Sequence, residues 1–200
     1  MAAPATKTIG DLSGKWVLNK TLSDPTDPAL ALQGVGWLLR KAIGAATIHI
    51  SVTQYVDDGG VTHIDIDQSA SGLSSTREAR TLDWTAHAHK DWLFGQVEGK
   101  NRFISAADAA ALVAADGEAR RERWVDSAFL AEDWLEGEAE GKGPQGETHI
   151  LGHVKAEAGW FATQIWGFQD IGGERRYVRN VVVAKGDKFE SFKMIYDFVE

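Results

Sequence analysis

Gly14-Lys15-Trp16 opens the most informative part of the sequence, and DPALALQG at residues 27–34 and WLLRKAIG at residues 37–44 follow it. In the first of these two segments Asp27 suits a helix N-cap, Pro28 the first helical position, and the closing glycine a left-handed end. The second segment predicts another helix over residues 37–43, with cations in its last turn. A helix pair between the first two strands of a β-rich chain predicts a lid over a cavity.

Two regularly alternating strands come after the helices. Residues 46–56 place Ile48, Ile50 and Val52 on one face, and residues 61–68 repeat the pattern after a turn at residues 57–60. Further strands are predicted at residues 15–20, 76–86, 92–98, 100–105, 148–157, 160–169, 174–184 and 188–198. Because short hairpins join about eight to ten strands, the sequence predicts an all-β fold, a closed antiparallel up-and-down β-barrel with a helix-turn-helix lid.

One barrel accounts for residues 11–200, and residues 1–10 are predicted to be a flexible N-terminus. Residues 106–146 form a partly helical insertion that is too short and too polar to hold a core of its own. The insertion could cap the barrel, extend the sheet or form a partner surface. Its Trp124 and Trp134 are expected to pack onto the barrel.

The composition limits the classes of function. A net charge of -8 argues against a nucleic-acid groove, which needs a cationic surface. The absence of cysteine excludes disulfides, thiol catalysis and cysteine-ligated metals. The first residues lack the apolar run of a secretory signal and no stretch has transmembrane length, so we expect a cytoplasmic protein without stable membrane insertion. The sequence does not determine the oligomeric state.

At this point the chain resembles the calycin superfamily, and within it the intracellular fatty-acid-binding proteins and other lipocalin-like barrels. The motifs that carry the resemblance are Leu12-Ser13-Gly14-Lys15-Trp16, the helix pair ending Leu39-Arg40-Lys41-Ala42, a strand finishing Thr53-Gln54, and a last strand ending Ile195-Tyr196-Asp197. It covers roughly residues 11–70 and 160–199. The resemblance implies a lidded barrel with Trp16 at its bottom and a hydrophobic ligand inside.

The chain departs from this family at the carboxylate clamp. The family commonly holds a carboxylate with a buried arginine and an Arg-x-Tyr pair on the final strand. Here Tyr196 survives, but Met194 replaces its basic partner and Phe168 stands where the other arginine is expected. A buried carboxylate without a cation is costly. We therefore expect a largely neutral hydrophobic or aromatic ligand rather than a free fatty acid.

The candidate ligand-binding residues come from the lid and the last three strands. Gln164, Trp166 and Phe168 share one face of a strand, and Arg179 would point inward beside Val181 if Tyr196 does, as a polar anchor for a ligand carbonyl or hydroxyl. Arg179 could equally face outward in a cross-strand ion pair, and the facing of Arg77 and Arg80 is open as well. The predicted set is Trp37, Leu38, Gln164, Trp166, Phe168, Arg179, Val181, Met194 and Tyr196.

Two histidine pairs and one acidic row have a possible chemical role. His87 with His89, and His149 with His153, could each contribute two metal ligands, or could be solvent-facing positions of strands. No third ligand is indicated by spacing, so we expect no metal and no cofactor. Haem held by a lone histidine is a weaker alternative. The row His63, Asp65 and Asp67 could serve acid–base chemistry, but the opposing isoleucines favour an external, solvated row.

Two functions therefore stay open. The first is a carrier or sequestering protein that binds a small hydrophobic molecule inside the barrel. The second is a cofactor-free isomerase or cyclase that acts on a hydrophobic polyketide-like or terpenoid-like substrate in the same cavity. No G-x-S-x-G, HExxH or phosphate-binding loop is present, and catalytic residues are not identified, although Tyr196, Arg179 and a histidine are the candidates.

Overall fold

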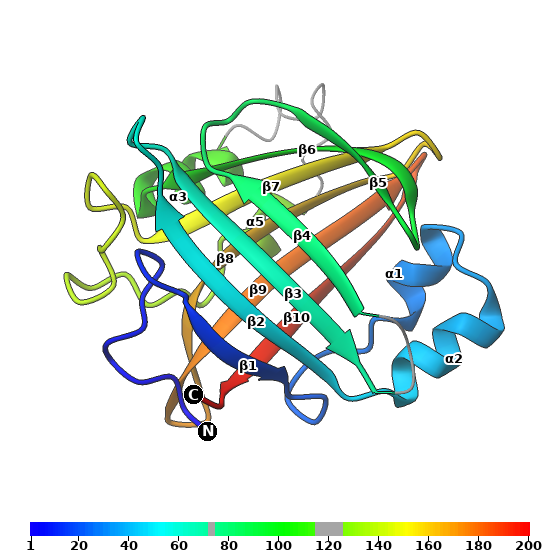
Figure 1. Ribbon diagram of the computed structural model, residues 1–200, viewed down its shortest axis with the longest axis horizontal. Helices are drawn as coiled ribbons and strands as arrows, with labels where there is room; N and C mark the ends of the chain where they lie inside the picture. Colours follow the sequence, from blue (N-terminus) through cyan, green and yellow to red (C-terminus); the bar gives the residue numbers. More distant parts are fainter. Residues whose placement is uncertain (72–74, 115–125) are drawn as a thin grey trace.

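One strongly curled antiparallel sheet of ten strands forms the framework of the computed structural model, which describes residues 1–71, 75–114 and 126–200 (Figure 1). Its strands are β1 (Gly14–Leu18), β2 (Ile48–Val56), β3 (Thr62–Ala70), β4 (Ser75–Thr81), β5 (His87–Asp91), β6 (Gly95–Ile104), β7 (His149–Ala156), β8 (Phe161–Ile171), β9 (Glu174–Lys185) and β10 (Lys188–Phe198). Their spatial order is β4-β3-β2-β1-β10-β9-β8-β7-β6-β5, so each strand pairs with a sequence neighbour except where β1 meets β10. This meander confirms the predicted all-β class.

The predicted closure of the barrel is not confirmed, because the sheet is open between β4 and β5 in the part of the chain that the structure describes. The chain leaves β4 at Thr81, and Trp84 adopts a left-handed φ of 60° on the way to β5. Trp84 N–H donates to Asn101 O of β6 at 2.8 Å, and Arg80 Nη1 donates to Asn101 Oδ1 at 2.6 Å. The two sides of the opening are thus joined by a side-chain hydrogen bond and a backbone hydrogen bond to β6. The continuous strand pairing that a closed barrel requires is not formed there among the described residues.

The strand boundaries near this opening also differ from the prediction. β5 is a short strand at 87–91 that the sequence analysis missed, since its alternation is polar and most of its residues are exposed. The two strands predicted at 92–98 and 100–105 form the single strand β6, and residues 92–94 make the turn between β5 and β6.

The predicted helix pair lies between β1 and β2, as α1 (Asp27–Leu32) and α2 (Trp37–Ala45). The N-cap of α1 is Thr26, so Asp27 lies in the first turn instead. α2 continues through Gly44 and has no basic residue in its last turn, because it runs further than predicted. α1 buries Ala29 and packs on β9 and β10, whereas no residue of α2 is buried. α1 is therefore the helix that covers the concave side.

The described part of the insertion covers the outer face of the sheet (Figure 1). α3 (Ala106–Ala114) and α5 (Ser127–Leu130) pack with Leu151, Ile165 and Val182 in a second core. Asn180 Nδ2 donates to Phe129 O at 2.9 Å, and Trp134 packs against the same core, as expected for that residue. Trp124 lies outside the described residues.

Because both faces of the adjoining strands are covered, His149 and His153 are buried. The expectation that they face solvent is therefore wrong. His63 and Asp65, in contrast, lie on the outer side of β3, opposite the fully buried Ile64, so that expectation is confirmed.

The N-terminal residues lie against the sheet beside the C-terminal strand. Ala3 N–H donates to Arg175 O at 2.7 Å, Phe198 N–H donates to Met1 O at 3.0 Å, and Ile9 is fully buried. Flexibility of residues 1–10 and the single unit over 11–200 stay predictions. None of the helices within the described residues has both the length and the apolar character needed to cross a membrane.

Trp16 is the centre of the larger interior cluster. It is fully buried, its Nε1 donates to Leu12 O at 3.0 Å, and its ring contacts Tyr177 and Phe198 at centroid distances of 5.2 and 4.9 Å. Gly14 lets β1 approach this cluster, since its φ is +138° and an added Cβ would meet Glu200 O at 2.8 Å.

We expect Gly14→Ala to lower the free energy of unfolding by about 2–4 kcal/mol, because it combines a strained φ with a backbone clash. Gly34→Ala is the matched control: its φ is +91°, but nothing lies within 4 Å of the added Cβ. The control should cost about 1 kcal/mol. Urea unfolding of both variants measures the difference, and equal losses would contradict the role assigned to the close approach at Gly14.

Candidate functional site

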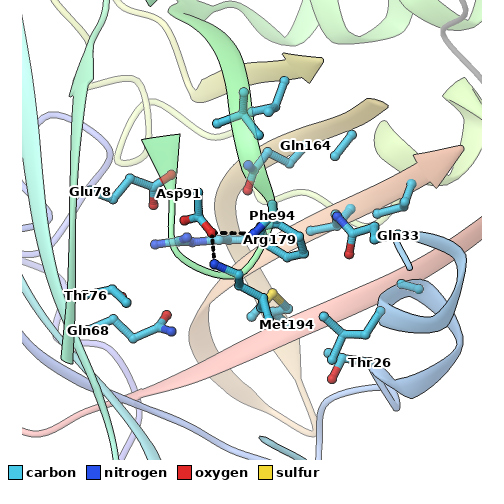
Figure 2. Close-up of a pocket in the computed structure, with 18 of the residues that line it drawn as sticks. Thr26, Gln33, Gln68, Thr76, Glu78, Asp91, Phe94, Gln164, Arg179 and Met194 are labelled. Carbon is cyan, nitrogen blue, oxygen red and sulfur yellow. Dashed lines mark hydrogen bonds between the residues drawn. The ribbon is translucent and has the colours of Figure 1, made fainter. Parts of the chain in front are cut away.

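A cavity of about 300 Å³ lies on the concave side of the sheet, within the usual range for small-molecule sites. It is bounded by α1, by the strands on both sides of the opening, and by the turn between β5 and β6 (Figure 2). The inward side chains of the curled sheet leave this space unfilled beneath the helix that covers it.

Most of the cavity wall is apolar. Alternation along β9 turns Val181 and Val183 inward, and the paired positions of β8 and β10 add further small and aromatic side chains. The apolar lining residues on these strands and their neighbours include Ala162, Val181, Val183, Phe192, Met194, Val97, Phe94 and Trp160. An apolar or aromatic guest is therefore favoured in this space.

The turn between β5 and β6 is held by one carboxylate. Asp91 Oδ1 accepts hydrogen bonds from the backbone N–H groups of Leu93 and Phe94 at 2.7 and 2.8 Å (Figure 2). An aspartate that bonds the backbone two and three residues ahead fixes a tight turn. The turn directs Phe94 onto Trp160, at a centroid distance of 5.1 Å, and so completes the wall.

Arg179 is the most unusual group of the site. Its side chain is 7% exposed, and its guanidinium lies 3.9 Å from the ring centroid of Trp166. Its Nε donates to the Tyr177 hydroxyl at 2.9 Å, whereas its buried Nη2 has no hydrogen-bond partner within the described residues. No carboxylate of the described chain forms an ion pair with Arg179, so a lone cation stands in the cavity wall.

The electrostatics keep this cation charged and its neighbours neutral. Burial raises the pKa of Tyr177 and of Tyr196 above the ordinary value, so both phenols stay protonated at neutral pH. Burial opposes the charge on Arg179, but Tyr177, Tyr196 and Glu78 outweigh it and hold the pKa of Arg179 above its ordinary value.

A second buried arginine lies beside the same tryptophan. The guanidinium of Arg80 is 4.8 Å from the Trp166 ring centroid, and Arg80 forms an ion pair with Glu78 besides its bond to Asn101. Arg80 is thus neutralised where Arg179 is not. The interior is consequently less neutral than expected from the sequence, and the replacement of clamp arginines by Met194 and Phe168 stays a prediction.

Gln164 adds a neutral polar group to the same wall. Its Oε1 accepts a hydrogen bond from Trp166 Nε1 at 2.7 Å, and the whole side chain is 9% exposed. Since the oxygen is engaged, the amide NH₂ is the part of Gln164 that remains available, and it has no partner within the part of the chain that the structure describes.

The structure brings together four of the nine predicted ligand-binding residues at the cavity: Gln164, Arg179, Val181 and Met194. Trp166, Phe168 and Tyr196 are fully buried behind that layer, where Trp166 and Tyr196 carry Arg179. Trp37 and Leu38 are 63% and 76% exposed, because α2 turns Ile43 rather than its first residues toward the cavity. Ligand contact at these nine positions stays a prediction.

The structure shows whether Arg77, Arg80 and Arg179 point toward the cavity or toward solvent. Arg80 and Arg179 point inward, and Arg77 forms an exposed ion pair with Asp65 at 2.8 Å at the rim. Phe94 and the lining residues of α1, including Leu30 and Gln33, were not predicted from the sequence. The spacing Asp91-x-Leu93-Phe94 is a signal of the turn that could have indicated Phe94.

The histidines lie apart from this site, except for His89 at its edge. His153 Nδ1 and Thr163 Oγ1 are 2.9 Å apart, and His149 Nε2 is 3.4 Å from Glu136 Oε1 on the outer face. Within the described ranges, no three side chains of metal-ligating type come together.

Two curated fungal proteins are similar to the chain over nearly its whole length. The "Probable pericyclase scpY" of Mollisia scopiformis is 28% identical and covers 99% of this chain and 95% of its own. The "Pericyclase pydY" of an Acremonium species is 25% identical and covers 100% of this chain and 97% of its own. No protein-family model matches the chain.

The solved structures that match include lipid-binding and fatty-acid-binding proteins. Lipid binding protein 8 of Caenorhabditis elegans superposes with a TM-score of 0.56 at 10% identity, over 96% of this chain and 98% of that one. Further fatty-acid-binding proteins match in the same way. The likeness confirms the predicted calycin resemblance at the level of architecture: the chain has the fold of the fatty-acid-binding proteins.

Proposed function

We propose that this protein is a pericyclase, an enzyme that accelerates a concerted cyclisation or rearrangement of a hydrophobic unsaturated substrate in its cavity. The observation that carries the proposal is the cavity itself, with apolar and aromatic walls and a covering helix, in a chain that matches a pericyclase and a probable pericyclase over nearly its whole length. The cyclase alternative drawn from the sequence is thereby preferred to the carrier.

A pericyclic reaction requires little from a protein beyond a cavity of suitable shape. In a pericyclic reaction, σ and π bonds of one molecule rearrange in a cyclic transition state, so the product is an isomer and neither protons nor electrons are exchanged with the protein. Part of the barrier is the entropy of folding a flexible chain so that its reacting ends meet. A rigid cavity that admits only the folded conformer reduces this barrier.

The wall of the cavity is suited to this selection. The buried Val181 and Trp160 and the partly buried Phe94 form a surface with few rotatable bonds, and Asp91 fixes the turn that carries Phe94. An extended polyene would have to bend to fit about 300 Å³ beneath α1. The same walls exclude water from the reacting carbons.

A carrier is the second candidate, and the fold of the fatty-acid-binding proteins favours it. A carrier binds the extended ligand without changing it. The two functions therefore predict the same binding but different turnover, and this difference is what an experiment can measure. Action in the cytoplasm and the lack of a nucleic-acid partner stay predictions from composition.

We expect the purified protein to accelerate at least one of three probe reactions by about 100-fold or more over buffer. The probes are a linear ketone that joins a terminal enone through three methylene groups to a terminal diene, a linear conjugated tetraene, and an allyl vinyl ether. They report cycloaddition, electrocyclisation and sigmatropic rearrangement respectively. Product formation is followed by chromatography, with heat-treated protein as the blank.

Displacement of the uncharged dye Nile red measures binding of the same probes. Saturable binding with buffer rates for all three would favour the carrier and contradict the enzyme. Absence of both binding and turnover would contradict both functions.

We expect Val181→Phe to weaken Nile red binding by at least about tenfold, because the ring occupies space in the cavity. Leu38→Ala is the control at a predicted site residue that does not line the cavity, and it should leave the affinity within about twofold. Fluorescence titration measures both. Equal losses would instead place the ligand at the outer side of α2.

A further inference from the structure

Two unengaged hydrogen-bond donors converge on the cavity from adjacent strands. One is the buried Nη2 of Arg179 and the other the amide NH₂ of Gln164, whose oxygen is already bonded to Trp166. Arg179 is paired with Trp166 across the β8–β9 ladder, so Gln164, two residues away, lies diagonal to it on the same inner face. Both side chains are more than nine-tenths buried and both line the cavity (Figure 2).

A buried donor such as Arg179 Nη2 requires an acceptor. An unpaired buried polar group costs about 1–3 kcal/mol, and more when it is charged. Glu78 is engaged by Arg80, and Asp91 by the backbone of its own turn. Among the described residues none accepts a hydrogen bond from Arg179 Nη2, and an oxygen of the ligand would suit this donor.

Trp166 holds both donors in place. Its indole N–H fixes the oxygen of Gln164 at 2.7 Å, while its ring face supports the guanidinium of Arg179 at 3.9 Å. Tyr177 fixes the remaining rotation of the guanidinium through Arg179 Nε. The two donors are therefore preorganised before any ligand binds, which is the arrangement that stabilises charge developing in a transition state.

We infer that the substrate carries a carbonyl oxygen conjugated to its reacting double bond, and that Arg179 and Gln164 donate hydrogen bonds to this oxygen while Trp166 acts as a positioning residue. The inference rests on the proposed pericyclase function and names its substrate class. A cation next to a neutral amide suits an oxygen that is polar in the ground state and more negative in the transition state. A carboxylate, by contrast, would gain nothing from this change.

The reaction class that follows is an intramolecular cycloaddition of an electron-poor alkene to a diene. Hydrogen bonds to the carbonyl draw electron density from the alkene and lower the barrier for attack by the diene. Three π bonds become one π bond and two new carbon–carbon σ bonds within one molecule. The linear ketone probe, in which a terminal enone is joined to a terminal diene, is such a trienone. It closes in this way to a fused bicyclic ketone of the same formula, with no oxidant, reductant or proton donor.

The test uses the trienone for turnover and its hydrocarbon analogue, with CH₂ in place of the carbonyl, for binding by Nile red displacement. We expect Arg179→Lys and Gln164→Leu each to lower kcat for the trienone by about 10- to 100-fold with a smaller change in KM. Trp166→Phe, which keeps an aromatic face but replaces the indole by a smaller ring without the N–H, should lower kcat by about tenfold. Hydrocarbon affinity should change less than about twofold in the variants.

Arg102→Lys is the matched control, since Arg102 is an exposed arginine that stacks on Trp84 away from the cavity. It should behave as wild type. If the variants lose hydrocarbon binding and trienone turnover in parallel, the three residues only support the cavity and the inference is overturned.

Two further outcomes separate this inference from the proposed function. Acceleration of the tetraene but not of the trienone by the wild-type protein would overturn the carbonyl assignment and leave the pericyclase standing. Binding of all probes without any acceleration would overturn the pericyclase, and tight, Arg179-dependent binding of decanoate in that case would assign the cation to a carboxylate ligand.

Discussion

The stacking of Arg179 on Trp166 is the interaction on which the interior of this protein depends. A guanidinium that is buried without a carboxylate is tolerated only if other groups replace its lost hydration. Here the indole face, the Tyr177 hydroxyl and the neutral rings of Tyr177 and Tyr196 do so. The same indole, through its N–H, orients Gln164, so one side chain links the large aromatic cluster to the polar part of the cavity.

The covered outer face of the sheet explains why this site can be rigid. β8 and β9 are buried along nearly their whole length, since the insertion packs against them from outside and the cavity wall lies inside. Asn180 and Gln169, which point outward, bond to carbonyls of the insertion. The residues that hold Arg179 thus sit on strands fixed from both sides, a requirement for a preorganised site.

The likeness to the fatty-acid-binding proteins and the difference from them concern separate parts of the chain. Element order and the helix pair give the shared architecture. The difference lies in the buried arginines of the cavity, which are Arg80 on β4 and Arg179 on β9. Arg80 forms an ion pair with Glu78, whereas Arg179 has no carboxylate partner among the described residues. A cavity with one free donor pair instead of a carboxylate clamp suits a substrate that is mostly hydrocarbon and carries a single carbonyl.

The sequence predicts the all-β class, the helix pair between the first two strands and the inner face of β2 and β3, because β2 and β3 are solvated on one side and therefore alternate. It could not determine the facing of Arg179, since strands buried on both faces lose alternation. Nor could it fix the opening between β4 and β5, which depends on the turn at Trp84. Contacts between segments far apart in the chain decided both, and with them the position of the donors.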